Sequence, residues 1–375
     1  MEQALYIHIP FCKAKCLYCD FYSIVPETRG IAAAYVKSLL KQIKAINCPL
    51  KTIYIGGGTP TVLGFKLLES LLEGLKGFLR PGLEFTVEAN PESLDAQKIA
   101  LLKDKGVNRL SIGAQSFDDN KLKGLGRIHT AKQARQAIER SYKKGFRDIS
   151  CDLIFGFYNE SLNSWQEELA QAVSLPITHI SCYSLTYEKK ACLFSLLKKK
   201  KIAPLDEEIC GRMYQIAIDY LRKKGFKQYE VSSFAKQGYI SRHNYNYWQN
   251  NPYIGLGPSA ASYVDGIRSV NVSDTLEYIK RFKADKSLIA FKEKLSAIDS
   301  ARETAALKIR TNEGINYRGF KKKTGFDFLG LERAREAGLL SDGLIKYVKS
   351  ARENIGIKLT RKGFLFCDRA SSALV

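Results

Sequence analysis

The chain has 375 residues, of which 45% are hydrophobic and 26% are charged. This composition is typical of a globular protein with a sizeable core and excludes a wholly disordered or fibrous chain. Its 59 Lys and Arg outnumber its 38 Asp and Glu, so the formal net charge is +21, which favours anionic partners without indicating a fold. No apolar run approaches the roughly 18 residues of a membrane span. The start of the chain, Met1–Ala4, lacks the pattern of a secretion signal, so we expect a cytoplasmic protein.

The first half of the chain alternates between short apolar runs and amphipathic segments. Six runs predict strands, at Leu5–Ile9, Thr52–Ile55, Glu84–Glu88, Arg109–Ile112, Asp148–Ile154 and His179–Leu185. The segments between them predict helices, near Ile31–Ile46, Phe65–Phe78, Ser93–Lys105, Ala131–Lys144 and Leu162–Ser174. Repeated strand–helix units predict a parallel sheet with helices outside, here an α/β fold with a partial (β/α)6 barrel.

After about Thr186 the alternation fades. A helix is predicted from about Glu207 to Lys224, and a loop rich in asparagine and aromatic residues follows near residues 243–248. From about Ala297 a smaller unit of helices and short strands ends the chain. We therefore predict three units: a barrel core over 1–186, an α+β extension over 187–296, and a small domain of helical or winged-helix type over 297–375.

Five successive predicted strands end in polar or glycine-rich residues. The first leads into a loop with three cysteines and the second into Gly56–Gly58. The third ends at Glu88, the fourth at Gln115, and the fifth carries Asp152. Chemistry in such barrels gathers where the strands end, so we expect these residues to line one site.

The cysteine loop carries the strongest chemical signal. Its spacing is Cys12-x3-Cys16-x2-Cys19, in a chain with nine cysteines. An odd number of cysteines without a secretion signal indicates metal or redox chemistry rather than a disulfide framework. Three thiolates can hold three irons of a cubane 4Fe–4S cluster and leave the fourth iron without a protein ligand. The alternative is a zinc site, but structural zinc takes four ligands, usually in two pairs, and no second pair is evident.

These cysteines resemble the signature of the radical S-adenosylmethionine (SAM) superfamily. The flanks Tyr6–Cys12 and Cys19–Phe21 are similar to the oxygen-independent coproporphyrinogen III oxidase (HemN-like) family, and most of all to its haem-chaperone (HemW-like) branch. The resemblance extends to Leu185–Glu188, Gly255–Pro258 and Leu359–Gly363. It implies a 4Fe–4S cluster that passes one electron to SAM, which yields methionine and a 5′-deoxyadenosyl radical. It also implies an external reductant of the flavodoxin or ferredoxin type.

The resemblance further implies which residues contact SAM. The amino and carboxylate groups of SAM would chelate the open iron. Gly57, Gly58 and Thr59 would bring backbone close to the methionine moiety, which needs the missing side chain of glycine. Glu88 would receive the SAM ammonium, and Arg127 would pair with the carboxylate in a charge-assisted bond.

The remaining SAM contacts come from other strands. Gln115 and Asp152 would bond the ribose hydroxyls and nearby polar atoms, while Tyr6 and His8 would face the substrate or SAM. No residue is assigned as catalytic. Taken singly, each residue also fits a plainer role: a turn for the glycines, a helix cap for the carboxylates, a surface cation for the arginine and a core histidine for His8.

Two departures argue against oxidase activity. The oxidases usually carry another cysteine two places after the third, where this chain has Phe21. They also have a longer extension before the cluster loop, whereas Cys12 is already the first ligand here. Both features favour the chaperone branch.

A second motif points to haem. His243-Asn244-x-x-Tyr247-Trp248 resembles the haem-binding motif of the chaperone branch, and imidazole is a common axial ligand of haem iron. Tyr247 and Trp248 would flank the macrocycle, and Asn244 would orient the loop. The plainer reading is a polar loop held by aromatic packing. The family often has a histidine at the place of Ala261, and alanine has no imidazole to contact haem or substrate there.

The leading hypothesis is a cytosolic haem chaperone that delivers haem to acceptor haemoproteins. Respiratory enzymes at the membrane are the expected acceptors, since a basic surface would assist peripheral docking there. The alternative is an oxygen-independent oxidase that removes carboxyl groups from two propionates of coproporphyrinogen III to give protoporphyrinogen IX. A third hypothesis, from the +21 charge, is a radical SAM protein acting on RNA, which predicts salt-dependent RNA binding. We expect no specific nucleic-acid partner.

Overall fold

The computed structural model describes residues 2–25, 29–328, 330–350 and 353–375. Its centre is a set of parallel strands: β1 (Gln3–Ile9), β2 (Leu50–Gly57), β3 (Glu84–Ala89), β4 (Arg109–Gln115), β5 (Asp148–Phe155) and β6 (His179–Ser184). They pair in chain order. All six predicted strands and the partial α/β barrel are therefore confirmed, with ends that differ by at most a few residues.

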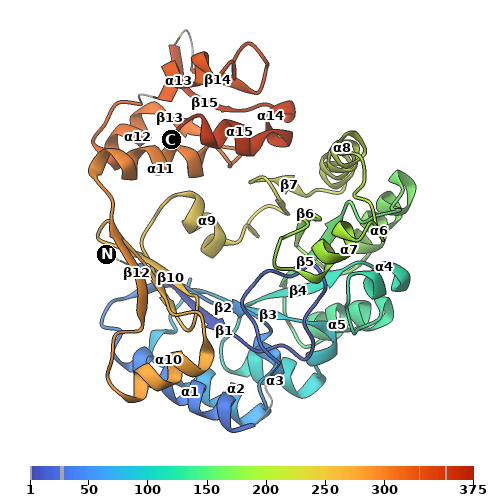
Figure 1. Ribbon diagram of the computed structural model, residues 1–375, viewed down its shortest axis with the longest axis vertical. Helices are drawn as coiled ribbons and strands as arrows, with labels where there is room; N and C mark the ends of the chain where they lie inside the picture. Colours follow the sequence, from blue (N-terminus) through green and yellow to red (C-terminus); the bar gives the residue numbers. More distant parts are fainter. Residues whose placement is uncertain (1, 26–28, 329, 351–352) are drawn as a thin grey trace.

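Helices cover the outer face of this curved sheet (Figure 1). They are α1 (Arg29–Lys44), α2 (Phe65–Gly74), α3 (Ala96–Asp104), α4 (Asp119–Gly124), α5 (Ala131–Lys143) and α6 (Leu162–Ser174). The six-residue α4 was not predicted, because a segment so short shows no helical periodicity. Its start is fixed by Asp118, whose carboxylate accepts a hydrogen bond from the Lys121 backbone amide. Among the described residues, no helix is both long and apolar enough to cross a bilayer.

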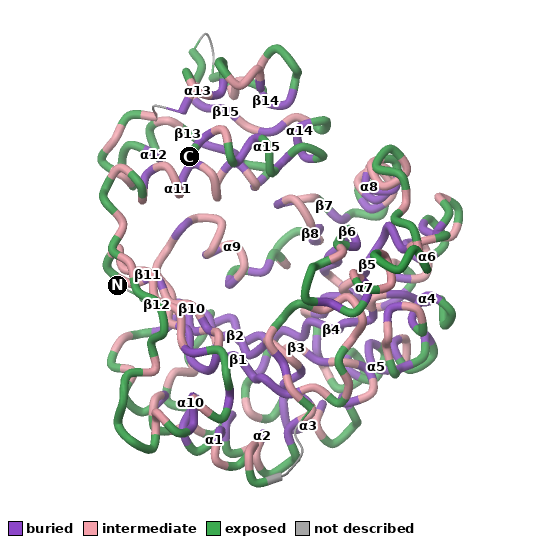
Figure 2. Tube along the Cα trace, in the orientation of Figure 1, coloured by how far each residue is buried: buried purple, intermediate pink, exposed green. Residues whose placement is uncertain are grey.

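The inside of the barrel is polar. Side chains alternate along a strand, and on β4 the apolar residues Leu110 and Ile112 are fully buried in the core. The intervening Ser111 donates a hydrogen bond to Asp152 of β5 (2.9 Å). Figure 2 shows these strands as the largest buried region of the chain. Polar side chains that can form hydrogen bonds therefore face the barrel interior, which is not filled by an apolar core.

Later strands extend the sheet at both edges. Next to β6 lie β8 (Ser233–Ala235) and β7 (Lys227–Gln228), while β9 (Tyr253–Leu256), β10 (Ala261–Val264), β11 (Ile267–Asn271) and β12 (Ile289–Lys294) continue from β1. The accompanying helices are α7 (Cys192–Lys198), α8 (Glu207–Lys223), α9 (Arg242–Trp248) and α10 (Thr275–Lys283). Ala261, the departure from the family pattern, is the first residue of β10. The division at residue 186 stays a prediction, since strands from both sides of it share one 12-stranded sheet.

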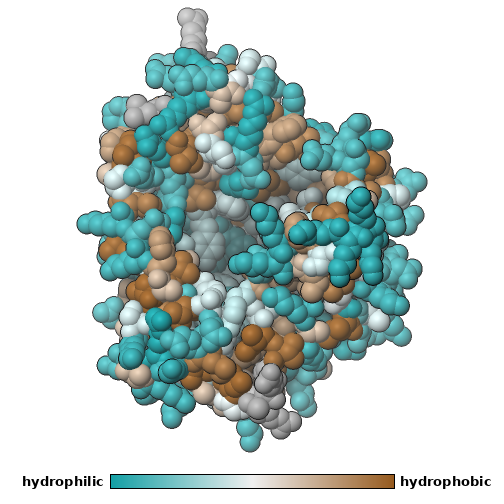
Figure 3. Space-filling view, viewed as in Figure 1, coloured by the Kyte–Doolittle hydropathy of each residue, from teal (hydrophilic) through white to brown (hydrophobic). Residues whose placement is uncertain are grey.

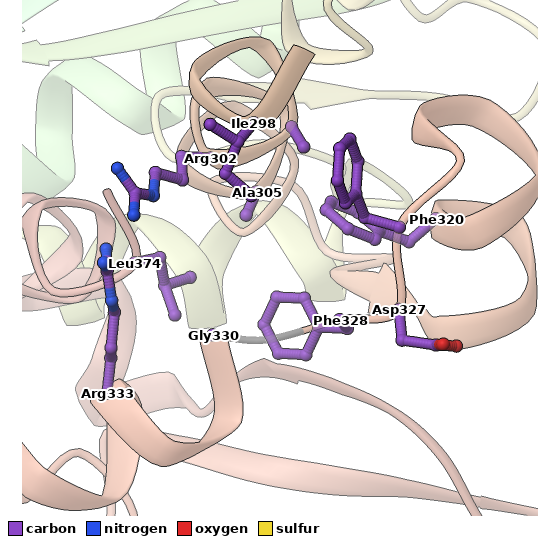
Figure 4. A pocket seen from close by; sticks show the side chains of 11 residues that line it. Ile298, Arg302, Ala305, Phe320, Asp327, Phe328, Gly330, Arg333 and Leu374 are labelled. Carbon is purple, nitrogen blue, oxygen red and sulfur yellow. The ribbon is translucent and has the colours of Figure 1, made fainter. Parts of the chain in front are cut away.

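The chain ends in a smaller unit that lies apart from the barrel helices (Figure 1). Its elements are α11 (Ala297–Lys308), β13 (Ile315–Asn316), α12 (Tyr317–Thr324), α13 (Gly330–Glu336), β14 (Ile345–Ser350), β15 (Glu353–Leu359), α14 (Arg361–Leu365) and α15 (Cys367–Ser372). The order helix, strand, two helices and two strands agrees with the expected winged-helix type. A cavity of about 60 Å³ lies between Phe320, Phe328 and Leu374 of this unit (Figure 4).

The segment predicted as an aromatic loop is a helix, and that expectation was wrong. Ser241 caps α9, because its hydroxyl accepts a hydrogen bond from the Asn244 amide (3.3 Å). The Glu84 carboxylate accepts hydrogen bonds from the Arg242 and His243 amides, each at 2.8 Å. A carboxylate at a helix N-terminus stabilises the helix. Because Glu84 precedes the helix by more than 150 residues, the local sequence gave no sign of this cap.

Candidate functional site

A cavity of about 710 Å³ lies where strands β1–β5 end. Nine of the residues singled out in the sequence line it: Cys12, Cys16, Cys19, Gly57, Gly58, Glu88, Gln115, Arg127 and Asp152. They come from five strand ends and their loops, which are distant in sequence. The structure thus brings these residues to one place, while the role of each stays a prediction.

The cysteine loop between β1 and α1 is held by backbone hydrogen bonds. The Cys12 amide donates to Ile24 O (2.9 Å), and the Ile24 amide donates to Pro10 O (2.8 Å), which closes the loop at its base. In its middle, the Leu17 amide donates to Leu125 O (3.0 Å). None of these backbone contacts uses a cysteine side chain. The three cysteines form no disulfide, are half-buried and line the cavity.

A polar network links two of the thiols. Thr59 Oγ1 lies 3.6 Å from Cys12 Sγ and accepts a hydrogen bond from Asn90 Nδ2 (2.8 Å). Arg127 donates to Asn90 Oδ1 (2.6 Å) and to Gly113 O (2.7 Å), and its Nη1 lies 3.4 Å from Cys16 Sγ. The buried Thr59 therefore supports the site from behind and does not line the cavity.

The glycine turn after β2 has no room for side chains. Gly57 has φ +106°, and a Cβ there would lie 2.6 Å from the His8 ring. A Cβ on Gly58 would lie 2.6 Å from Phe11 O, the carbonyl next to the first cysteine. Only glycine allows this close approach, so the turn packs directly against the start of the cysteine loop.

Two carboxylates face the cavity. Glu88 accepts hydrogen bonds from the Tyr54 hydroxyl (2.6 Å) and the Gly57 amide (3.2 Å), yet burial raises the pKa of Glu88 to about 7. Asp152 accepts hydrogen bonds from Ser111 (2.9 Å) and Ser150 (3.1 Å), and burial raises its pKa as well. Both groups gain from a cationic or hydrogen-bond-donating ligand that favours the carboxylate form.

Gln115 has a strained backbone at the end of β4. Its φ is +63°, in the left-handed region that residues with a side chain seldom adopt. The pairing of β4 with β5 shifts register between Ile112 and Gln115. This irregularity places the Gln115 side chain in the cavity lining, and such strain is concentrated at functional sites.

Tyr6 and His8 do not line the cavity. The Tyr6 hydroxyl lies 3.0 Å from His8 Nδ1, and His8 Nε2 lies 2.9 Å from Tyr22 O. His8 is buried against Gly57, and this burial lowers its pKa. The pair underlies the glycine turn, so direct contact of either residue with SAM or substrate stays a prediction.

The His243 motif lies at the opposite end of the barrel, near the first residues of β2 and β3. His243 is fully buried, with Nδ1 2.9 Å from Thr52 Oγ1 and Nε2 2.9 Å from the Tyr247 hydroxyl. Burial lowers the pKa of His243 to about 3, so the imidazole is neutral. Asn244, Tyr247 and Trp248 are half-buried. Figure 3 shows a hollow in this face of the molecule at the place that α9 takes in Figure 1.

Two residues around the cavity had no predicted role. Asn90 joins Thr59 to Arg127, and Tyr54 is hydrogen-bonded to Glu88. Asn90 stands two places after Glu88, and its position at a predicted strand end indicates a place near the site. Tyr54 lies inside a predicted strand, and its position indicates no such place.

The donors fit a cluster that takes one thiolate on each of three irons. Burial raises the pKa of the Cys12 and Cys19 thiols, so binding of metal there has to displace their protons. Within the ranges that the structure describes, no three His, Cys, Asp or Glu side chains are grouped tightly enough for a single metal ion. The fit rests on the free thiols and on the wide cavity they share.

Known proteins resemble this chain along its whole length. The family model of the radical SAM superfamily matches residues 6–172. Heme chaperone HemW of Bacillus subtilis (strain 168) is 35% identical over 380 residues, which cover 100% of this chain and 99% of the relative. Heme chaperone HemW of Lactococcus lactis is 34% identical over 362 residues, or 96% of this chain and 93% of the relative.

A solved structure shares the fold. Coproporphyrinogen III oxidase (HemN) of Escherichia coli, a radical SAM enzyme, superposes with a TM-score of 0.84, covering 100% of this chain and 90% of that chain. At 20% identity this likeness shows the fold alone. Membership in the radical SAM superfamily implies a 4Fe–4S cluster and SAM as cofactors. By its similarity to curated relatives along the full chain, the protein belongs to the HemW family of the radical SAM superfamily.

Proposed function

We propose that this protein is a haem chaperone of the radical SAM type, which binds haem and delivers it to acceptor haemoproteins. The observation that carries the proposal is the match, over 99% of its length, to a relative named heme chaperone. Two separate features of the molecule support it. One is the cysteine-lined cavity, and the other is the α9 motif beside the hollow at the far end of the barrel.

Cys12, Cys16 and Cys19 would hold the cluster, and the same cavity would hold SAM. The bound cluster supplies one-electron reduction of SAM. Arg127 is fixed by Asn90 and Gly113, so its guanidinium is oriented for the SAM carboxylate before binding. Gly57 and Gly58 admit the methionine backbone, and Glu88 accepts a hydrogen bond from the SAM amino group.

The remaining contacts complete the SAM site. Gln115 and Asp152 would bind the ribose and its neighbouring polar atoms, from strand ends that face the same cavity. Three residues outside the cavity lining would position the glycine turn and the cysteine loop, namely Thr59, Tyr6 and His8. A flavodoxin or ferredoxin type of protein would deliver the electron.

Haem would bind at α9. The neutral His243 imidazole is the form that coordinates iron, with Tyr247 and Trp248 along the macrocycle and Asn244 orienting the helix end. Both ring nitrogens of His243 are hydrogen-bonded, so iron must displace one hydroxyl partner. Acceptors would be respiratory enzymes at the membrane, approached from the cytoplasm through the basic surface.

The deciding experiment is an anaerobic haem titration of the cluster-reconstituted protein, followed by Soret absorbance. Wild type is expected to show saturable one-to-one binding, and His243→Ala to raise the haem Kd at least about tenfold, or about 1.4 kcal/mol. His179→Ala is the matched control, because His179 is also buried with both ring nitrogens hydrogen-bonded. Equal Kd values for wild type and His243→Ala would reject the motif. Absence of saturable binding by wild type would reject the chaperone and make coproporphyrinogen decarboxylation the next assay.

Binding of SAM is expected to depend on the protonation of Glu88. With the pKa of Glu88 at about 7, the carboxylate that would accept a hydrogen bond from the SAM amino group is depleted at pH 6 and predominant at pH 8. The SAM Kd should therefore fall about tenfold between these pH values beyond any change in Glu88→Gln. Calorimetry on protein with the oxidised cluster measures the SAM Kd at each pH. The pH dependence that remains in Glu88→Gln is due to the amino group of SAM itself and is subtracted. Parallel pH profiles for the two proteins would contradict the assignment.

A further inference from the structure

One residue contacts both proposed sites. The Tyr54 hydroxyl donates to Glu88 Oε1 at 2.6 Å, in the cavity where SAM would bind. The ring of the same Tyr54 stacks on His243, with centroids 4.9 Å apart and planes at 29°. Tyr54 is 7% exposed, so it cannot leave either contact without repacking the barrel interior. The SAM pocket and the α9 motif are therefore joined through a single buried side chain.

The sequence keeps space for this connection. A Cβ on Gly56 would lie 2.8 Å from the Glu88 carboxyl carbon and 2.8 Å from Tyr54 Cε1. Any side chain at position 56 would separate the Tyr54 hydroxyl from Glu88. Gly56 has no positive φ that would require glycine, so the close approach of Glu88 and Tyr54 is the reason that the structure gives for glycine at this position.

At the other end of Tyr54, His243 is fixed in a closed arrangement. The hydroxyls of Thr52 and Tyr247 are hydrogen-bonded to its two ring nitrogens, and the ring of Tyr54 covers one face of the imidazole. Two of these three residues, Thr52 and Tyr54, belong to β2. Iron can reach Nε2 only if the Tyr247 hydroxyl leaves, and a firmly placed Tyr54 ring opposes movement of the imidazole.

We propose that Tyr54 is a positioning residue through which SAM at Glu88 disfavours haem binding at His243. The inference rests on the proposed function, and its steps follow from the contacts. A SAM amino group at Glu88 favours the carboxylate, and a hydrogen bond to a carboxylate is stronger than one to a neutral acid. The Tyr54 hydroxyl is then held more tightly and its ring keeps His243 closed. Linkage is reciprocal, so haem disfavours SAM by the same factor.

The first arm of the test needs no haem. Amide hydrogen exchange of α9 is measured in cluster-reconstituted protein with saturating SAM and without SAM, the cluster being kept oxidised so that SAM stays intact. We expect SAM to slow exchange of the α9 amides about fivefold in wild type and to leave it unchanged in Tyr54→Phe. Tyr278→Phe is the control, since Tyr278 is a buried tyrosine whose hydroxyl bonds Gln42 and Gly257, neither of which lines the cavity or belongs to α9.

The second arm is the haem titration with and without SAM. Saturating SAM should raise the haem Kd about fivefold in wild type and Tyr278→Phe, and by less than about twofold in Tyr54→Phe. An unchanged or lowered Kd with SAM in wild type overturns the coupling, and so does an equal SAM effect in Tyr54→Phe. If wild type binds no haem at all, the proposed function fails. The amide hydrogen exchange of α9 then still decides whether binding of SAM affects α9 through Tyr54.

Discussion

Cys16→Ser is expected to reduce the iron content and the visible cluster absorption of anaerobically reconstituted protein to background. Among the described residues, the cavity is lined by three cysteines and no fourth thiol that could replace one that is lost. A serine hydroxyl is a poor substitute for a soft thiolate. The Arg127 guanidinium, 3.4 Å from Cys16 Sγ, would also lose the anionic partner that a ligating thiolate provides. SAM binding should disappear together with the cluster.

The control for Cys16→Ser is Cys48→Ser. Cys48 is another half-buried free cysteine, located just before β2 and outside the cavity lining. Its replacement should leave iron content and absorption unchanged. The cysteine loop is fixed by backbone hydrogen bonds of Cys12, Leu17 and Ile24, so Cys16→Ser should keep the circular dichroism of the wild type. Full iron content in Cys16→Ser, or equal losses in both variants, would show that the cluster is held elsewhere.

Much of the fold could be predicted because the barrel is built from local patterns. Each strand is a short apolar run, and each following helix is an amphipathic segment that ends near a turn. The helix at Leu162–Ser174 was placed with both ends correct, since Ser161 supplies a capping hydroxyl and the helix presents a clear apolar face. Patterns of this kind depend on neighbours in sequence, and they are readable without tertiary contacts.

The parts that could not be predicted depend on distant partners. Helix α9 begins where the Glu84 carboxylate meets its first amides, and nothing near residue 242 indicates Glu84. The cysteines proposed to hold the cluster were recognisable by their spacing. By contrast, Tyr54 acquires a role only from the pairing of β2 with β3, which places its hydroxyl beside Glu88. Motif spacing predicts ligands, while the residues that connect two sites become visible only in the packed barrel.

Lys121→Met is expected to lower the free energy of unfolding of the barrel by about 3–5 kcal/mol. Lys121 Nζ lies 2.5 Å from Glu160 Oε1 and 3.3 Å from Glu168 Oε2, and all three side chains are at most 5% exposed. Methionine fills similar space but leaves two buried carboxylates without their cation. Glu160 also accepts hydrogen bonds from the amides of Gly156 and Phe157 (2.8 and 3.0 Å), so the loss would loosen the loop that follows β5.

Urea unfolding followed by tryptophan fluorescence measures this loss, because Lys121 Nζ lies 5.6 Å from the ring centre of the buried Trp165. The exposed Lys76, paired with Glu73 on the surface, is the control, and Lys76→Met should cost less than about 1 kcal/mol. Adding Glu168→Gln to Lys121→Met should restore part of the stability, since one uncompensated carboxylate is removed. Equal stability of Lys121→Met and Lys76→Met would mean that the buried cation contributes nothing.

The dependence of this loss on pH separates charge from packing. Burial raises the pKa of Glu168, and Lys121 opposes that rise, so in Lys121→Met the folded-state pKa must lie higher still. A carboxyl group whose pKa is higher in the folded state binds more protons there than when unfolded, and stability then falls as the pH rises between the two pKa values. The cost of Lys121→Met should therefore be larger at pH 8 than at pH 5. A cost that is the same at both values would assign the effect to lost packing around Trp165 instead of to the buried charges.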